Sequence, residues 1–349
     1  MRKESQKRVQ KSTSIDPLKY SVGIDIGKES FAVCMSVINQ DQSVKVLGSR
    51  SFKNSLGGFK NLDYWIKKKQ KLPLDLRVNM EATGVYHERV AWFLHSNSYH
   101  VSVTLPNQAK RYLQGIGIKS KNDKTDAIGL ARMGAEQNLA PWNPPEESFM
   151  TLRDLTRQRQ QIQESKTVFN NQKEAYLFSQ HQHPAVIKNL NRILKTLEKT
   201  LKDLDDTLLK IIHEDPELNE KIERITQIKG VGWLTVVTIL AETSAFHMIK
   251  NQSQLVSYAG YDIVENQSGN HTGKTRISKK GNARIRRILH MPAFSVVASQ
   301  EPAFKALYER VYDRTKIKMK GYVAVQRKLL VVIYALWKNE QQYQSGLTV

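Results

Sequence analysis

Apolar and polar residues follow two different periods along this chain, and the change of period divides it. Near the start, short runs rich in valine and isoleucine predict strands at residues 21–27, 31–38 and 44–52, joined by polar turns that favour an antiparallel meander. Residues 55–69 then carry apolar side chains at helical spacing. Strands and helices alternate beyond that point, with a strand expected at 76–80, a helix at 85–96 and a strand at 100–105.

This order predicts an α/β N-terminal domain of the ribonuclease-H-like type, because three antiparallel strands followed by alternating helix and strand are typical of that fold. Topology alone does not fix function. The basic segment 110–124 contains glycines and is predicted to be a loop, and a helix is expected from about Asp123 to Asn138. The proline-rich residues 141–145 mark the clearest boundary in the chain.

Residues 152–212 are charged, glycine-free and interrupted at Pro184. Leucines and isoleucines recur here at spacings of three and four, as in the seam of a coiled coil. The segment is therefore either a helical hairpin or an arm that contacts a second subunit, and we favour the arm. The apolar positions are Leu190, Ile193, Leu194, Leu197, Leu201, Leu204, Leu208 and Leu209.

The last part of the chain predicts a mainly α C-terminal domain, with helices at 283–299 and 322–339. Residues 228–232 (Ile-Lys-Gly-Val-Gly) lie between two helical patterns and resemble a helix-hairpin-helix, whose turn directs a helix N-terminus at a phosphate. An ordinary connection between helices is the alternative. The predicted organisation is a basic tail at 1–19, an α/β catalytic domain at 20–145, a helical coiled-coil linker at 146–216 and the C-terminal domain at 217–349.

Composition narrows the class of partner. The formal net charge of +21 gives a positive field suited to a polyanion, so nucleic acid is the expected partner and an anionic membrane surface the weaker alternative. The longest apolar runs are far shorter than the ~20 residues that span a bilayer. The start of the chain is polar and basic, unlike a signal peptide, so we expect a cytoplasmic protein. A single cysteine, Cys34, excludes an internal disulfide and a cysteine-rich zinc site.

Candidate chemistry begins at Asp25, which lies in the first apolar strand between Gly23 and Gly27. Acids are depleted in strands and an isolated buried charge is costly, so such a residue usually caps, pairs or binds a cation. The glycines allow another backbone, a phosphate or an ion to approach. A strand-end acid facing water is one alternative. The first phosphate loop of sugar kinases and actin-like ATPases is another, although the sequence has no second glycine-rich phosphate loop.

Further acids provide partners for Asp25. Glu81 ends a strand that we expect beside the first, and Asp123 and Asp126 are three apart at a helix start, so their carboxylates can share a face. Such acids, brought together, can hold two hard divalent cations and support phosphoryl transfer. A helix cap and a first-turn acid are the alternative roles for Asp123 and Asp126. The neighbouring lysines, which would lie beside a bound phosphate backbone, are Lys121 and Lys124.

A second basic region, residues 266–290, contains no acid. It can neutralise several phosphates, so we expect nucleic-acid binding to depend steeply on salt. Ser268 lies in this region, and a serine hydroxyl is a poor nucleophile until a base or a metal activates it. A plain turn residue is the alternative role for Ser268. The cations of the region are Lys274, Arg276, Lys279, Lys280, Arg284, Arg286 and Arg287.

The acidic motifs resemble those of the bacterial DEDD transposases, family one hundred and ten of the insertion sequences. The resemblance continues through residues 228–232 and 258–260 and ends with residues 267–269, 276–282 and 286–293. It covers nearly the whole chain, and the order and spacing of the motifs make it specific. The acidic motifs are Gly23-Ile24-Asp25-Ile26-Gly27-Lys28, Glu81-Ala82-Thr83-Gly84-Val85-Tyr86 and Lys121-Asn122-Asp123-Lys124-Thr125-Asp126-Ala127.

The resemblance implies a RuvC-like N-terminal domain, a coiled-coil middle and a C-terminal transposase domain with a nucleophilic serine. By motif match the serine is Ser268, with Thr272 and Ser278 as lesser candidates. The family's serine attacks a DNA phosphate to form a covalent phosphoserine, and strands are then exchanged. The acids matched to the family's magnesium ligands, at two sites that manganese can also fill, are Asp25, Glu81, Asp123 and Asp126.

The resemblance also implies partners. They are double-stranded DNA at the element ends and target, and a structured non-coding RNA, the bridge RNA, that pairs with target and donor DNA. A nucleoid-associated homo-oligomer, either dimer or tetramer, is expected, and the acids and the serine of different subunits are hypothesised to act together. A RuvC-like nuclease that uses metal-activated water is the alternative enzyme. A basic architectural nucleic-acid-binding protein is the non-enzymatic alternative.

Overall fold

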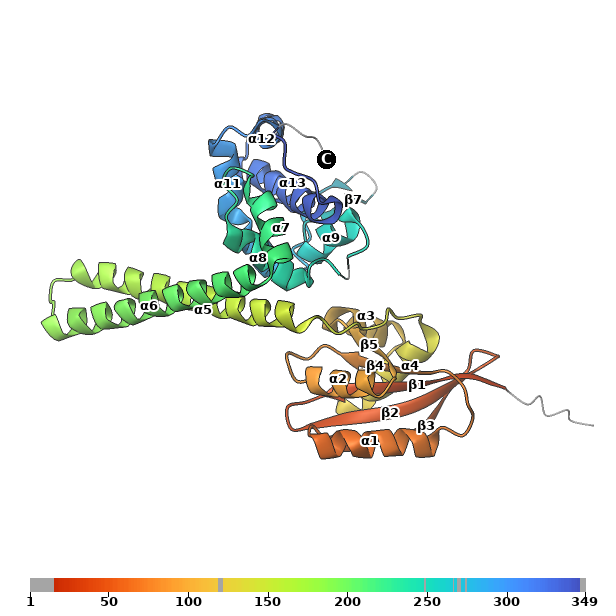
Figure 1. Cartoon of the computed structure of the whole chain (residues 1–349). Helices are drawn as coiled ribbons and strands as arrows, with labels where there is room; N and C mark the ends of the chain where they lie inside the picture. Colours follow the sequence, from red (N-terminus) through yellow and green to blue (C-terminus); the bar gives the residue numbers. More distant parts are fainter. Residues whose placement is uncertain are drawn as a thin grey trace, which may run out of the picture. The chain divides into compact units, whose positions relative to one another are not determined.

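The computed structural model describes residues 16–118, 122–247, 249–265, 267–268, 271–273 and 275–345. The chain divides into two compact units between Pro144 and Pro145, and each unit has its own hydrophobic core. Figure 1 gives the elements of both units. The boundary falls inside the proline-rich segment, where the missing N–H groups and fixed backbone angles of proline disfavour continuous helix or sheet.

The first unit is built on one mixed sheet with the strand order β3-β2-β1-β4-β5. Strands β1, β2 and β3 form an antiparallel meander, and β4 and β5 run parallel to β1. The predicted meander and the predicted position of the fourth strand beside the first are thus confirmed (Figure 1). The strands are β1 Pro17–Ile26, β2 Ser30–Asn39, β3 Val44–Lys53, β4 Leu76–Glu81 and β5 His100–Thr104.

The strand β1 begins earlier than predicted. Pro17 pairs with Asn39 and Lys19 pairs with Ile38, so residues 17–19 belong to the sheet and not to the predicted tail. Proline suits this first strand position because no ladder hydrogen bond has to come from its nitrogen.

Four helices accompany the sheet in the part of the first unit that the structure describes. The predicted loop at 110–124 is wrong over its first half, because helix α3 continues to Gly115. Pro106 starts this helix, and Ala109 is fully buried on one face of it, which stabilises the helix despite its basic, glycine-containing sequence. The helices are α1 Leu56–Lys69, α2 Glu88–Ser96, α3 Pro106–Gly115 and α4 Asp123–Glu136.

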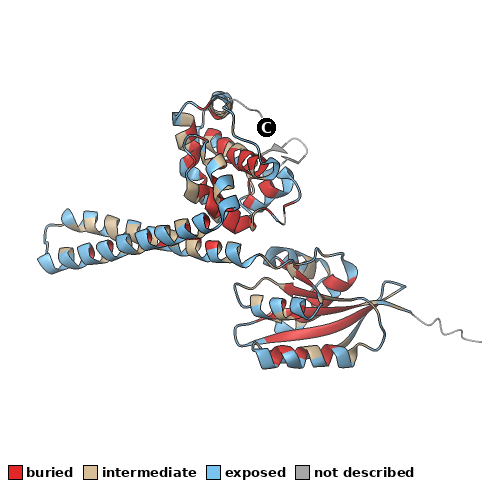
Figure 2. Cartoon of the chain, viewed as in Figure 1, coloured by how far each residue is buried: buried red, intermediate tan, exposed pale blue. Residues whose placement is uncertain are grey.

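The second unit begins with a long helical hairpin, α5 Glu147–Leu177 and α6 Pro184–Glu214. Arg159 pairs with Asp205 and Lys166 with Glu198, so the two helices run antiparallel (Figure 1). Five leucines and an isoleucine of α6 are buried, whereas much of the remaining hairpin surface is exposed (Figure 2). An internal hairpin is therefore present, and contact with a second subunit stays a prediction.

The rest of the second unit is a bundle around α8 and α13, with a small β region. The predicted mainly helical character is confirmed, but the expected helix 283–299 is two helices that meet at Leu289. None of the described helices is long and apolar enough to cross a membrane. The helices are α7 Pro216–Thr226, α8 Trp233–Thr243, α9 Gln252–Ala259, α10 Ala283–Ile288, α11 His290–Ala298, α12 Pro302–Thr315 and α13 Lys318–Asn339. The strands are β6 Ile263–Val264, β7 Gln267–Ser268, β8 His271–Thr272 and β9 Arg276–Ile277.

Candidate active site

Asp25 and Glu81 lie at corresponding positions on neighbouring parallel strands. Strands β1 and β4 pair as far as Ile24 and Met80, and the two acids are the next residue on each strand. Side chains alternate across a sheet, and Val22, Ile24, Val78 and Met80 belong to the core under α1 and α2. Asp25 and Glu81 therefore point to the opposite face, which α4 covers.

Small residues on that face let α4 approach the sheet closely. A Cβ added to Gly23 would lie 2.0 Å from the backbone nitrogen of Ala131 and 2.3 Å from the carbonyl oxygen of Ala127. One added to Gly134 would lie 2.6 Å from the Ser21 hydroxyl. Gly23 is thus required for helix packing, and of the approaches that the sequence analysis allowed beside it, the structure shows that of another backbone.

Buried polar contacts fix the helix and the loops around the acids. Asn79 on β4 donates its amide to the Leu130 carbonyl at 3.1 Å and accepts a hydrogen bond from the Thr104 hydroxyl at 2.6 Å. Asn54 donates to the carbonyls of Gly27 and Tyr86 at 3.0 and 3.1 Å. Asn54 thus connects the loops that follow Asp25 and Glu81, a role that the sequence analysis missed.

Asp123 and Asp126 occupy the first turn of α4. The cap of this helix is Asn122, whose side chain accepts hydrogen bonds from the backbone N–H and the hydroxyl of Thr125, each at 2.8 Å. The capping role considered for Asp123 is therefore filled by its neighbour. Lys124 follows in the same turn and is exposed, whereas Lys121 lies outside the described residues.

The four acids influence one another electrostatically. Burial, together with the negative charges of Asp126, Asp123 and Glu81, raises the pKa of Asp25 to about 6. A carboxylate among like charges favours either a proton or a cation. These carboxylates are the ligand type that hard divalent cations prefer. Nevertheless, no three acid, histidine or cysteine side chains in the described parts of the chain already form a group that could hold a metal ion.

In the second unit, Ser268 lies in a short β ladder. Its backbone pairs with His271, as Gln267 pairs with Thr272. This ladder comes, in sequence, between the two strands of a stem in which Ile263 pairs with Ile277. The side chains of Ser268 and Thr272 and all of Lys274 lie outside what the structure describes.

The base of this stem is held by close backbone packing. Asp262 accepts hydrogen bonds from Ser278, from its N–H at 2.8 Å and from its hydroxyl at 2.5 Å. Gly281 lies so close to residues 258–260 that an added Cβ would be 2.4 Å from the Tyr258 carbonyl oxygen. Two motifs quoted from the sequence, residues 258–260 and 276–282, therefore pack against each other, and Ser278 supports the stem.

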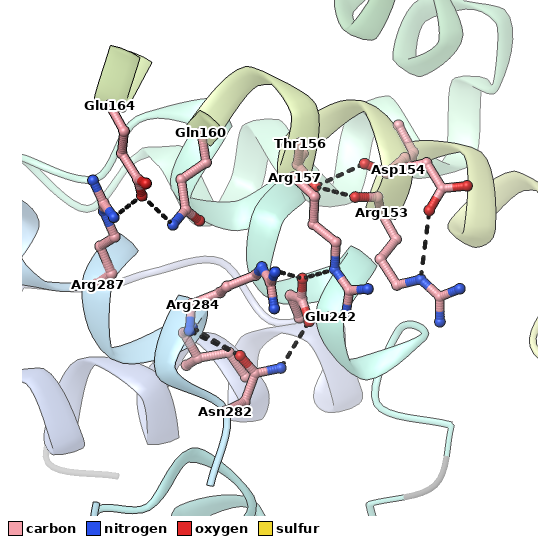
Figure 3. Close-up of polar contacts among 12 residues, drawn as sticks. Arg153, Asp154, Thr156, Arg157, Gln160, Glu164, Glu242, Asn282, Arg284 and Arg287 are labelled. Carbon is pink, nitrogen blue, oxygen red and sulfur yellow. Dashed lines mark hydrogen bonds and ion pairs between the residues drawn. The ribbon is translucent and has the colours of Figure 1, made fainter. Parts of the chain in front are cut away.

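A buried carboxylate joins this region to the hairpin (Figure 3). Glu242 on α8 has a side chain only 1% exposed, and Arg157 on α5 donates to both of its oxygens, at 2.7 and 2.9 Å. The Asn282 amide donates to the same carboxylate at 2.7 Å while its oxygen caps α10. The Nε of Arg284 lies 3.8 Å from the Oε1 of Glu242. Burial alone would raise the pKa of Glu242, but hydrogen bonds from Arg157 and Asn282 outweigh it and lower the pKa.

The sequence analysis missed this network, because Arg157 and Glu242 are far apart in the chain and neither lies in a quoted motif. Cations of the basic region also have intramolecular partners. Arg287 pairs with Glu164, and Arg286 donates to the carbonyls of Ala259 and Gly281 (Figure 3 shows the Arg287 contact). Arg276, Lys279 and Lys280 are exposed, and Arg287 is exposed as well although it holds Glu164.

The turn at residues 228–232 connects α7 and α8 as predicted. Gly230 has a φ of +94°, and an added Cβ would be 2.7 Å from the Ser295 side chain, so glycine is needed there. A pocket of about 430 Å³ borders the turn, but its arginines, Arg159 and Arg287, are paired with Asp205 and Glu164. The geometry therefore favours an ordinary packed helix connection over a phosphate site.

Comparison with known proteins defines the class of this chain as a transposase. A family model for DEDD transposases, described as "Transposase", matches residues 22–180. A second model, described as "Transposase IS116/IS110/IS902 family", matches residues 222–309. The chain belongs to the IS110 family of transposases.

Relatives of two kinds are similar to it along most of the chain. The pilin gene-inverting protein of Moraxella bovis is 29% identical over 94% of this chain and 99% of its own length. The transposase for insertion sequence element IS1111A of Coxiella burnetii is 21% identical over 93% of this chain and 91% of its own length. Among solved structures, Thermus thermophilus RuvC matches 35% of this chain and 99% of its own with 14% identity and a TM-score of 0.28.

Proposed function

We propose that this transposase cuts and rejoins DNA through a covalent bond to Ser268, assisted by divalent cations at Asp25, Glu81, Asp123 and Asp126. The observation that carries the proposal is the placement of the acids. Two adjacent strand ends and the first turn of one closely packed helix bring the four acids to one edge of the sheet.

The donor set suits Mg²⁺ or Mn²⁺, because both prefer carboxylate oxygen. When bound, such cations would supply positive charge for a phosphate and for the oxygens that attack and leave it. The carboxylates would have to draw together around the cations, since they do not form a ready-made group of ligands. Burial and the mutual repulsion of the acids raise the pKa of Asp25, and a bound cation would relieve that repulsion and let the carboxylates approach one another.

The serine step needs no external energy source, because each bond that forms replaces a bond of the same kind that breaks. The Ser268 hydroxyl loses its proton and forms a bond to the phosphorus, while the bond from phosphorus to one sugar oxygen breaks. That sugar leaves as a hydroxyl after taking up a proton. Attack on the phosphoserine by the hydroxyl of another strand reverses the exchange, joins the strands and restores the serine.

We further propose that a structured RNA guides the protein and that the protein acts as a homo-oligomer, a dimer or a tetramer. The charge of +21 supports a polyanionic partner, and RNA is such a partner as much as DNA is. The exposed hairpin surface of α5 and α6 supports subunit contact. A coiled-coil contact between subunits would use that surface.

A covalent adduct tests the serine. Wild-type protein, end-labelled DNA carrying an element end, RNA transcribed from the element's flanks and Mg²⁺ should give labelled DNA that migrates with the protein in denaturing gels. Ser268→Ala should abolish the adduct, and Thr272→Ala and Ser278→Ala should retain it if they fold. Wild-type cleavage without an adduct would instead establish a nuclease that uses activated water.

The same assay tests the acids and the RNA. Asp25→Ala should lose both cleavage and adduct, and full activity of this variant would support an architectural role or another site. Omission of the RNA should abolish cleavage at the element end. Equal cleavage with and without it would contradict guidance by RNA.

A further inference from the structure

The second unit contains a pocket of about 620 Å³ that the chemistry proposed above does not use. It lies between the β6–β9 stem and helices α12 and α13. Aliphatic side chains form most of its inner surface, and cationic side chains also line it. The apolar part of the lining includes Ile263, Ile277, Val311, Val323, Ala324 and Val331.

The charge of this lining is one-sided. It includes Arg276, Arg314, Lys320, Arg327 and Lys328, and the described residues that line it include no acid. Burial lowers the pKa of Lys328, so its ammonium group is partly removed from water. Cations around an apolar surface suit a ligand that is anionic at one end and apolar at the other.

A nucleotide has this combination, with a phosphate and an apolar-faced base. The volume is within the usual range of about 300–1,000 Å³ for pockets that enclose small ligands, and is far too small for a duplex. The phenol ring of Tyr261 is fully buried, and its hydroxyl donates to Gln326 at 2.9 Å. A base would therefore pack against aliphatic side chains such as Ile277 and Val323, as bases removed from a duplex do in apolar enzyme pockets.

The position of the pocket connects it to Ser268. Ile263 and Ile277 both line the pocket and are paired with each other in the β6–β9 stem. The residues between these strands in sequence include Ser268. A DNA strand whose phosphate reaches Ser268 would thus have this apolar and cationic surface at the base of the same stem.

We propose that this pocket binds an unpaired DNA nucleotide beside the phosphate that Ser268 attacks. The inference rests on the proposed function for the position of the phosphate. Binding of the nucleotide does not require the reaction of Ser268, so it is tested separately, in protein that carries Ser268→Ala. Removal of one nucleotide from the stack would hold the strand in register for exchange, at a cost in base stacking that contacts with the pocket offset.

The test uses full-length protein and fluorescence anisotropy with a dye-labelled single-stranded DNA of twelve nucleotides and the matching duplex. Ala324→Trp should fill the pocket and weaken binding of the single strand about tenfold, the loss expected when one base contact is removed. Duplex binding should change less than about twofold, because a duplex does not enter. A 2-aminopurine in the single strand should brighten on binding, and should brighten less with Ala324→Trp.

A second pair of variants separates charge from shape. Arg314→Gln removes a pocket cation from α12, and Arg310→Gln removes an exposed arginine one turn earlier that does not line the pocket. Arg314→Gln should weaken the single strand more than Arg310→Gln. Thermal melts establish whether each variant is folded. If Ala324→Trp does not fold, the comparison of Arg314→Gln with Arg310→Gln tests the pocket by itself.

Equal losses for single strand and duplex, or no loss in either pocket variant, would overturn the proposal. If RNA of the same sequence binds more tightly than the DNA and Ala324→Trp weakens that binding, the pocket is assigned to RNA instead. Pocket-sensitive binding to phosphatidylglycerol vesicles but not to DNA would also overturn it. If the pocket variants lose single-strand binding but the wild type forms no Ser268 adduct in the earlier assay, the assignment of the pocket stands and the serine mechanism is rejected.

Discussion

Arg157 on α5 and Glu242 on α8 form a two-point ion pair that joins the helical hairpin to the helical bundle. The Glu242 side chain is almost fully buried, and the Arg157 side chain is 34% exposed. Asn282 completes the arrangement by donating to the same carboxylate and capping α10. The start of α10 and the end of the stem that precedes it are therefore tied to the hairpin through Glu242.

Loss of the Glu242 charge should destabilise the second unit. We expect Glu242→Gln to lower the free energy of unfolding by about 1–2 kcal/mol at pH 7, because the charge-assisted hydrogen bonds of a partly exposed arginine are weakened. Urea unfolding, followed by circular dichroism, measures this. Glu164→Gln is the control, because its ion pair with Arg287 is exposed on both sides and should contribute less than about 0.5 kcal/mol.

The effect of Glu242 should depend on pH in a defined direction. Its folded pKa is lowered from the ordinary value of 4.5, so its stabilising contribution is present above 4.5 and is lost as the pH falls through the folded pKa. The difference between wild type and Glu242→Gln should therefore shrink on going from pH 7 to about pH 3.5. An unchanged difference would contradict the ion pair as its source.

Asp25 should have the opposite effect on stability when no divalent cation is added. Because it is half-buried among like charges, Asp25→Asn should raise the thermal stability of the first unit, by about 1 kcal/mol after allowance for solvent screening. Thermal melts in a chelator measure this. Glu29→Gln, an exposed acid in the turn after β1, should change nothing.

Added Mg²⁺ provides the second half of the Asp25 experiment. Ligands that bind only the folded state raise its stability, so Mg²⁺ should raise the melting temperature of wild type and have a smaller effect on Asp25→Asn. An equal response in both proteins would count against a cation site at Asp25, whatever the variant's activity.

The meander and the neighbouring strands that end at Asp25 and Glu81 could be predicted from the sequence because both follow from local patterns. Alternation, strand order and motif spacing place Asp25 and Glu81 without knowledge of packing. Helix α3 was missed because its basic, glycine-containing sequence resembles a loop, and the burial of Ala109 that stabilises it is a tertiary effect.

The Glu242 network and the pocket beside α13 could not be predicted from local patterns, for a different reason. Both depend on side chains that are distant in sequence and converge only in the folded bundle, such as Arg157 with Glu242. The same limit applied to the basic region, where the sequence showed charge but not which cations have intramolecular partners. Arg286 and Arg287 have such partners.

Close packing at Gly23 gives a test of how the acids are positioned. Gly23→Ala would place a methyl group against the α4 backbone, so the helix and its two acids must move away from β1. We expect a loss of about 3 kcal/mol, the upper range for overpacking, since the obstacle is backbone and cannot rotate away. Gly57→Ala in α1, where nothing lies within 4 Å, should be neutral or stabilise by up to about 1 kcal/mol. Equilibrium unfolding of both variants makes the comparison.

The cations of the basic region should divide into two classes. Lys280→Gln, at an exposed position, should leave stability unchanged and reduce the slope of log affinity for DNA against log salt by up to about 1. Arg286→Gln should instead destabilise the protein by about 1–2 kcal/mol, because it removes donors from the carbonyls of Ala259 and Gly281. Salt titrations of duplex binding, paired with unfolding of each variant, measure both effects. A reduced salt slope in a fully stable Arg286→Gln protein would show that this arginine binds phosphate and does not support the fold.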